Sequence, residues 1–540
     1  MEDGARRLGA PDGGGGGGGA APEVASRDPV TGEVWRTYEA ASPDAVARAV
    51  ARARAAQRAW GARPAGERAR HLERFHGALY ARRHEVSEAL TRETGKPLAE
   101  ALGGEVLVGL DYARFYAAES RRLFAAPWFT PSSPSMWRKR VRVAHVPLGV
   151  VAVVCPWNYP FMLAAGVVLP ALAAGNAVVL KPSELTPTSG AMLGELLAEA
   201  GVPDGVMTVL QGAGETGAAL VGAAVDKVFF TGSVPTGRKV ARTCAERLIP
   251  CSLELGGSDP AIVLEDADLA HAARGIAWGR FTNAGQTCVA PKRVFVVGDA
   301  YEPFLALLAR AVESLRAGPA SSADSQIGPL IRPGQRALLE AQLADALARG
   351  ARVVARGTAR DGGAEGGAYF PPTLLADVSP EMRVMREETF GPLLPVARAR
   401  DADDAVARAN ASEFGLSASV WSRDAVRARA LAERIEAGTV AINDVAVVAG
   451  MADVPHGGVK ASGSGRSHGS HGLLECVRTQ TLVADRFGGW AQPWWFGGTT
   501  TAELHAGLDA ALRLLHGDSM RARLSGVRGA VRLLFGGRRA

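Results

Sequence analysis

The sequence lacks any apolar run long enough to cross a bilayer, because its longest apolar stretch, Leu148–Cys155, has only the length of a strand. Residues 1–20 also lack the apolar core of a secretory signal peptide. These two absences predict a cytoplasmic chain without a membrane-spanning helix. Peripheral contact with a membrane stays open.

Cysteine is scarce as well. The chain has five, at Cys155, Cys244, Cys251, Cys288 and Cys476. A small, odd number without a repeated spacing argues against both a disulfide framework and a zinc site. We therefore expect a reducing compartment and no metal centre.

Lysine is rare beside arginine, and the positive charge is concentrated at one end of the chain. The net charge is +6, but residues 518–540 alone hold six arginines and one aspartate. The rest of the chain is nearly neutral and carries no nucleic-acid-binding motif. We expect no nucleic-acid partner.

A length of 540 residues exceeds what one hydrophobic core usually supports, so two or more domains are expected. Helical periodicity predicts helices from Ser42, over Ala65–Thr91 and over Leu98–Leu123. Beyond Val141, β-rich runs alternate with helical patterns. The runs are Val150–Val154, Ala177–Leu180, Met207–Leu210, Lys227–Thr231, Ala261–Leu264, Arg293–Val297, Arg352–Ala355, Leu393–Ala397, Ser417–Trp421 and Thr439–Ile442. This alternation predicts an α/β fold with two doubly wound parallel-sheet domains.

Cys288 follows the small-residue, glycine-containing segment Asn283–Thr287, which would allow its thiol to lie on a tight turn. A nucleophilic thiolate also needs a polarising environment, which this segment alone does not supply. A cysteine with no further support is more often buried and inert.

Glu254 lies between Leu253 and Leu255 and precedes Gly256 and Gly257. Apolar neighbours would desolvate its carboxylate and raise its pKa, which suits a general base. The alternative, of equal weight, is a glutamate at a strand end that faces solvent.

Asn158 follows the expected strand Val150–Val154, within Pro156-Trp157-Asn158-Tyr159-Pro160. At the carboxyl end of a parallel strand its amide can reach a ligand, and amide N–H groups can form an oxyanion hole. For a lone asparagine, a proline-bounded turn is the commoner explanation.

Two glycine-containing segments compete as the nucleotide site. Gly212–Gly217 fits the pattern G-x-G-x-x-G, but Thr231–Arg242 holds no acidic residue where the ribose partner should lie. The segment Phe230–Gly237 also ends a strand and begins a helix, with Ser233 as the expected N-cap. Such a helix start attracts phosphate, and plain helix capping is the alternative.

Together these motifs resemble the aldehyde dehydrogenase superfamily over residues 27–482. The matching segments, in the family's order, are Glu93–Pro97, Pro156–Asn158, Lys181–Glu184, Phe230–Ser233, Glu254–Gly257, Gly285–Cys288, Glu387–Pro392 and Pro455–Lys460. Each segment is weak evidence alone, but the ordered set is specific. It favours the catalytic interpretation of Cys288, Glu254 and Asn158.

The resemblance implies NAD(P)-dependent oxidation of an aldehyde to its carboxylic acid. Cys288 would attack the aldehyde as a thiolate, while the Asn158 amide and the Cys288 N–H hold the oxyanion. Hydride transfer to the nicotinamide would leave a thioester, which water activated by Glu254 would hydrolyse.

The resemblance also implies the cofactor contacts. Lys181 and Glu184 would hold the adenosine ribose, and Glu388 the nicotinamide ribose. The other expected contacts are Ser183, Gly232, Ser233, Gly237, Leu255 and Phe390, with residues 232–237 facing the pyrophosphate. A carboxylate at Glu184 favours NAD, whereas Lys181 and Ser183 leave NADP open. The segment Gly212–Gly217 would then line the adenine pocket.

For the domains we expect a disordered glycine-rich N-terminus at 1–26, a cofactor domain at 27–253 and a catalytic domain at 254–455. Residues 456–486 would return to the cofactor domain and form an oligomerisation β-arm with residues near 135–150. We expect a homodimer or homotetramer. Gly166, where some family members carry a bulky aromatic, predicts a roomy, largely uncharged tunnel for the aldehyde.

Residues 487–540 extend beyond the resemblance. They contain an aromatic cluster, an expected helix over Thr501–Leu515 and a basic amphipathic helix. The cluster is Trp490, Trp494, Trp495 and Phe496, and the apolar residues of the last helix are Met520, Leu524, Val527, Val531 and Leu534. Such a helix can lie on an anionic membrane surface, although packing against protein is the commoner arrangement.

Three other functions are weaker. A CoA-acylating semialdehyde dehydrogenase would use Cys288 but needs no water-activating base, so Glu254 argues against it. A non-catalytic binding protein on the same fold would not need Cys288, Glu254 and Asn158 together. A Cys–His hydrolase is disfavoured because no histidine lies in a motif near Cys288.

Overall fold

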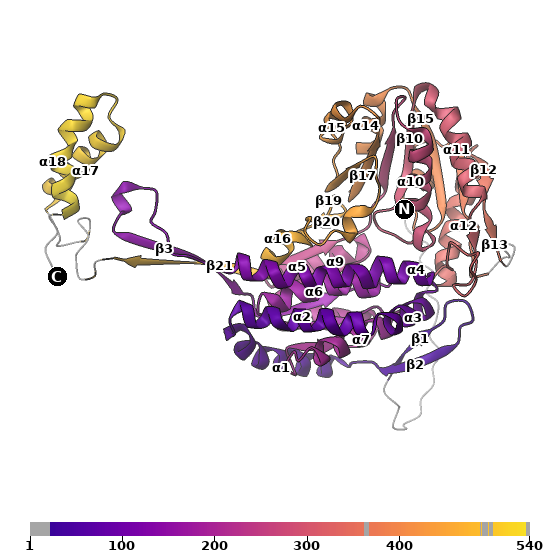
Figure 1. The fold of residues 1–540 in the computed structure, drawn as a ribbon, viewed down its shortest axis with the longest axis horizontal. Coiled ribbons are helices and arrows are strands. Elements are labelled where there is room, and N and C mark those ends of the chain that lie inside the picture. Colours follow the sequence, from indigo (N-terminus) through magenta and orange to yellow (C-terminus); the bar gives the residue numbers. More distant parts are fainter. Residues whose placement is uncertain (1–21, 361–366, 487, 489–494, 496–499, 536–540) are drawn as a thin grey trace, which may run out of the picture. The chain divides into compact units, whose positions relative to one another are not determined.

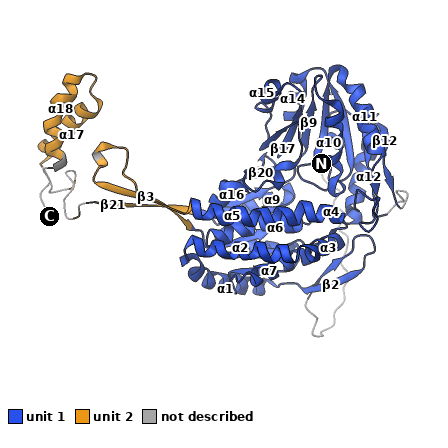
Figure 2. Ribbon diagram, in the orientation of Figure 1, with its two compact units in different colours: residues 1–122, 147–477 blue, residues 123–146, 478–540 orange. Residues whose placement is uncertain are grey.

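The computed structural model describes residues 22–360, 367–486, 488, 495 and 500–535 (Figure 1). The chain divides into two compact units, residues 1–122 with 147–477 and residues 123–146 with 478–540 (Figure 2). Most of the predicted disordered N-terminus lies outside the described residues, as do Trp490, Trp494 and Phe496. Its last residues are ordered instead, because strand β1 (Glu23–Arg27) pairs antiparallel with β2 (Val34–Glu39).

The first sheet of the larger unit has the strand order β20-β8-β7-β4-β5-β6. These strands are Gly463–Ser464, Cys251–Glu254, Lys227–Thr231, Val150–Val154, Ala177–Lys181 and Met207–Val209. All pair in parallel except β20 with β8. Helices α1 (Pro43–Ala62) and α6 (Pro160–Ala173) pack on β4 and β5, whose continuous apolar sequences reflect burial on both faces.

The second sheet of this unit has the order β12-β14-β15-β10-β9-β17-β18. Its strands are Arg352–Arg356, Thr373–Ala376, Leu393–Ala399, Pro291–Val297, Asp259–Val263, Ser417–Trp421 and Thr439–Ile442. Only β12 with β14 is antiparallel, and separate apolar clusters cover the two faces. The predicted pair of doubly wound parallel sheets is confirmed.

The helix predicted over Leu98–Leu123 is interrupted. It consists of α4 (Leu98–Ala101), a π-helical segment (Leu102–Leu107) and α5 (Val108–Leu123). The π segment carries Glu105, whose buried carboxylate accepts the backbone N–H groups of Phe161 at 2.9 Å and Met162 at 3.2 Å. Glu105 therefore satisfies amides in the first turn of α6, which a regular helical pattern does not reveal.

The second unit contains a two-stranded sheet of β3 (Lys139–Pro147) and β21 (Val477–Asp485). It also contains two helices, α17 (Thr501–His516) and α18 (Met520–Phe535), that pack against each other. A capping box of Thr500 and Glu503 begins α17. None of the described helices is long and apolar enough to cross a membrane.

Candidate active site

A cavity of about 300 Å³ at the carboxyl ends of β4, β7 and β8 collects the residues to which the sequence assigns chemistry. Its lining includes Asn158, Glu254, Cys288, Glu388 and Phe390. These five come from four segments of the chain, and parallel strands bring Asn158 and Glu254 to one edge of the first sheet.

Cys288 follows a turn of unusual backbone geometry. Asn283, Ala284 and Gly285 have successive φ values of 51°, 55° and 71°, all in the left-handed region. A Cβ on Gly285 would lie 2.5 Å from the Gly391 backbone. The Glu100 carboxylate accepts the Asn283 N–H at 3.0 Å and so helps to hold this conformation. The predicted tight turn beside the thiol is confirmed.

Burial dominates the electrostatics of the thiol. It raises the pKa of Cys288 to about 12, although the nearby Lys292 ammonium acts to lower that pKa. Lys292 is itself buried and donates from Nζ to the Cys288 carbonyl at 2.6 Å and the Thr287 carbonyl at 3.0 Å. Within the described ranges, the Cys288 N–H donates to no protein acceptor, so it is available to a ligand in the cavity.

Glu254 ends β8 with a side chain that is 14% exposed. Desolvation raises its pKa to about 8, the direction that its leucine neighbours predict. Ser467 donates from Oγ to Oε1 at 3.2 Å, while Oε2 lies 4.0 Å from His456 Nε2. The carboxyl group is therefore protonated over part of the neutral range.

A histidine pair lies behind Glu254. Burial lowers the pKa of His456 to about 4, so this ring is neutral at pH 7. It stacks on His468 at 5.5 Å, and His468 Nε2 is 2.7 Å from the Tyr112 hydroxyl. A Cβ on Gly166 would lie 3.1 Å from the Tyr112 ring and 3.2 Å from His468. The prediction of open tunnel space at Gly166 is wrong, because these two rings fill it.

Asn158 is buried in a tightly bonded loop. Its Nδ2 donates to the Gln286 carbonyl at 3.1 Å, which leaves one amide hydrogen for the cavity. Its own carbonyl accepts from Lys96 Nζ at 2.8 Å and from Asn283 Nδ2 at 2.9 Å. The loop that carries the amide is thus joined directly to the turn that precedes Cys288.

A second cavity of about 630 Å³ adjoins the first and shares Gly232, Ser233 and Arg332 with it. The other predicted cofactor residues in its lining are Lys181, Ser183 and Glu184, and Gly214 and Gly217 of the glycine-rich segment lie there too. Lys181 pairs with Glu184 at 3.4 Å. The set offers a carboxylate for ribose hydroxyls and a helix start for phosphates, so it fits a dinucleotide.

Two predicted cofactor residues, Ser233 and Gly237, make contacts that the sequence did not predict. Ser233 occupies the N-cap position of α9 (Val234–Glu246), but its Oγ contacts Thr236 Oγ1 at 3.1 Å and makes no capping bond to the backbone. Gly237 lines neither cavity, and a Cβ there would lie 2.5 Å from the Leu255 side chain. Its role in this structure is to let α9 approach Leu255.

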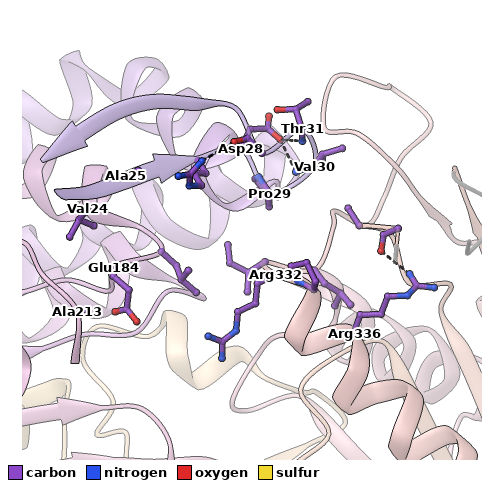
Figure 3. Close-up of a pocket in the computed structure, with 18 of the residues that line it drawn as sticks. Val24, Ala25, Asp28, Pro29, Val30, Thr31, Glu184, Ala213, Arg332 and Arg336 are labelled. Carbon is purple, nitrogen blue, oxygen red and sulfur yellow. Dashed lines mark hydrogen bonds between the residues drawn. The ribbon is translucent and has the colours of Figure 1, made fainter. Parts of the chain in front are cut away.

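Arg332 was missed by the sequence reasoning. It precedes α12 (Pro333–Ala348), lines both cavities and also lines a third of about 730 Å³ beside the turn Asp28–Gly32. Figure 3 shows Arg332 and Glu184 extending into this third space. Among the described residues its guanidinium forms no ion pair. The only sequence signal was an arginine where serine, threonine or aspartate usually caps a helix.

Comparison with known proteins agrees with this geometry. A family model described as the aldehyde dehydrogenase family matches residues 18–482. The chain belongs to this family. This aldehyde dehydrogenase is 38% identical over 473 residues to 4,4'-diapolycopene aldehyde oxidase of Methylomonas sp, with 88% of each chain covered. It is 40% identical over 464 residues to 3-sulfolactaldehyde dehydrogenase of Pseudomonas putida, covering 86% of this chain and 93% of the relative.

A solved structure of Mycobacterium tuberculosis aldehyde dehydrogenase, complexed with NAD+, matches the fold with a TM-score of 0.81. The sequences are 35% identical, and the match covers 86% of this chain and 95% of the other. The enzyme is thus an oxidoreductase that acts on aldehydes and uses a nicotinamide cofactor.

The turn before Cys288 generates a prediction about stability. Gly285→Ala should lower the free energy of unfolding by about 2–4 kcal/mol, because the new methyl group meets backbone atoms at a left-handed φ. Gly334→Ala is the matched control, since a Cβ there meets nothing within 4 Å. Urea unfolding followed by circular dichroism compares the two, and equal midpoints would show that the turn is not strained.

Proposed function

We propose that the protein oxidises an aldehyde to the carboxylic acid through a covalent thioester on Cys288, with NAD+ as preferred cofactor and Glu254 as the base for hydrolysis. The observation that carries the proposal is the single cavity that Cys288, Glu254, Asn158 and Glu388 line together. A nucleophile, a base, an amide donor and a carboxylate are the groups that this two-stage reaction requires.

The first stage begins with the thiol. Since the pKa of Cys288 is near 12, the resting group is neutral and must lose its proton before attack. The Lys292 charge beside it favours the thiolate. The thiolate forms a bond to the aldehyde carbon, and the carbonyl π electrons move to oxygen. The free Asn158 amide hydrogen and the Cys288 N–H would stabilise that oxyanion.

The cofactor residues would hold the dinucleotide at both ends. Lys181 and Glu184 would bind the adenosine ribose, and Gly232 and Ser233 at the start of α9 the pyrophosphate. Glu388, which accepts the Gly257 N–H at 3.1 Å, would bind the nicotinamide ribose. When bound, the nicotinamide accepts the hydride whose loss converts the thiohemiacetal into a thioester.

Hydrolysis completes the cycle. The Glu254 carboxylate takes a proton from water, whose oxygen attacks the thioester carbon. The carbon–sulfur bond then breaks, releasing the acid and returning Cys288 as thiolate. Transfer to CoA would need no such base, and Glu254 with a pKa near 8 therefore supports the hydrolytic reaction.

Substitutions of Cys288 and Glu254 should affect different stages of the reaction. Cys288→Ala should abolish NADH formation on an aldehyde panel followed by absorbance. Glu254→Gln should give a burst of about one NADH per active site, followed by a steady rate lowered roughly 10²–10⁴-fold, because only deacylation needs the base. Glu313→Gln, an exposed glutamate on α11 (Tyr301–Glu313), is the control. Turnover that survives Cys288→Ala, or a steady rate unchanged in Glu254→Gln, contradicts the mechanism.

A pH dependence follows from the pKa of Glu254. The raised pKa means that the carboxylate form, which accepts the proton, accumulates only as pH rises through about 8. Under conditions where deacylation limits turnover, kcat should rise to a plateau above that pH. A plateau already reached near pH 5, close to the ordinary pKa of glutamate, would remove the assigned role.

In this proposal the Glu184 carboxylate at the adenosine end selects the cofactor, whereas Arg332 binds both nucleotides. The wild type should have a higher kcat/KM with NAD than with NADP, since the Glu184 carboxylate repels a 2′-phosphate. Glu184→Gln should raise kcat/KM for NADP about tenfold or more. An unchanged ratio of the kcat/KM values for NADP and NAD in Glu184→Gln would show that the carboxylate does not select the cofactor.

Arg332→Gln should raise KM for both nucleotides about tenfold, because it removes a cation that can bind either pyrophosphate.

A further inference from the structure

The helical pair α17 and α18 is held together by its smallest residues. Gly507 lies against Leu533, and Gly526 and Gly529 lie against Ala510. These contacts allow a close approach of the two helices. They also show which side of each helix faces its partner. Because residues follow one another at a fixed angle around a helix, the side on which every other residue lies can be worked out from these contacts.

Six large apolar residues point away from this interface. They are Leu508, Leu512, Met520, Leu524, Val527 and Val531, with exposures from 36% at Val527 to 76% at Met520. Successive residues on a helix are about 100° apart, so Leu508 and Leu512 lie on the side of α17 opposite its contacts with α18. On α18, Met520, Leu524, Val527 and Val531 lie within about 60° of one another around the helix axis. These four residues form one strip along α18, here called the outer apolar face.

Arginines border the outer apolar face. Helix α18 carries Arg521, Arg523, Arg528 and Arg532 and no acidic residue. By the same geometry Arg523 lies on one flank and the other three lie on the opposite flank. None of the four forms an ion pair with any described residue, whereas Asp509 is already paired with Arg513. An apolar strip with cationic edges complements a layer of lipid tails beneath phosphate headgroups.

We propose that the α17–α18 pair docks on an anionic lipid surface, with the outer apolar face among the headgroups and the four arginines on lipid phosphates. A second copy of the chain fits this surface less well. Two such faces joined by a twofold axis would bring their arginine edges together, and like charges repel. The two helices have 16 residues each and would lie in the interface without crossing the bilayer.

Sedimentation of the full-length protein with vesicles tests the proposal. We expect binding to phosphatidylcholine vesicles that contain phosphatidylglycerol, little binding to pure phosphatidylcholine, and weaker binding as salt increases. Arg528→Gln/Arg532→Gln should weaken partitioning by about 20-fold or more, at roughly fivefold per arginine. Leu524→Gln/Val531→Gln should weaken it similarly, because the apolar contact is lost.

Matched controls lie elsewhere on the surface. Val426→Gln changes a valine that is 81% exposed, and Arg274→Gln changes an exposed arginine of α10 (Leu269–Phe281). Both should bind vesicles as the wild type does. Aldehyde oxidation in solution should be unchanged in every variant, which shows that the main unit is folded.

Three results would overturn the proposal. The first is a protein that stays in the supernatant with anionic vesicles at low salt. Another is equal binding to neutral and anionic vesicles, which would remove the part assigned to the arginines. The last is a change of sedimentation coefficient in Leu524→Gln/Val531→Gln without any change in vesicle binding, which would make the outer apolar face a contact between copies.

Discussion

A buried ion pair between Lys96 and Glu105 joins the elements on which the site depends. Both side chains are fully shielded from solvent. Glu105 accepts two amides at the start of α6, and Lys96 donates to the Asn158 carbonyl on the loop that leads into that helix. Removing one member of such a pair leaves a buried charge without its partner, which typically destabilises a fold by about 3–5 kcal/mol. The position of the Asn158 amide is therefore tied to the core of the first sheet.

Hydrogen bonds also join the loop of Asn158 to the turn that precedes Cys288. Asn283 donates to the Asn158 carbonyl, and Gln286 accepts the Asn158 amide. The residues of the left-handed turn are thus bonded to the loop opposite, so the turn is held by hydrogen bonds as well as by the shape of its glycine. Desolvation of the same enclosed region raises the pKa of both Cys288 and Glu254. Burial of this region therefore keeps the Cys288 thiol and the Glu254 carboxyl group mostly protonated at pH 7 before the reaction begins.

Sequence reasoning succeeded where the relevant pattern is local. Alternating β-rich and helical runs predicted both parallel sheets, because a buried parallel strand needs a continuous apolar segment. The convergence of Cys288, Glu254 and Asn158 was expected from a resemblance in motif order, and for Glu254 and Asn158 its physical basis is their place at the carboxyl ends of β8 and β4. The π segment was missed because the partners of its Glu105, the amides of Phe161 and Met162, lie more than fifty positions away. Gly166 was misjudged for a similar reason, since the rings that fill its space come from Tyr112 and His468.

The glycine and alanine contacts of α17 and α18 have a thermodynamic consequence. Small residues bring the backbones close but bury little apolar area, while the larger side chains remain in water. Two short helices with so little shared core are only marginally stable alone. Any surface that covers the exposed leucines and valines would also favour the helical state, because ligands that bind only the folded form shift its equilibrium. Susceptibility of this region to proteases would then report how much of the enzyme is bound.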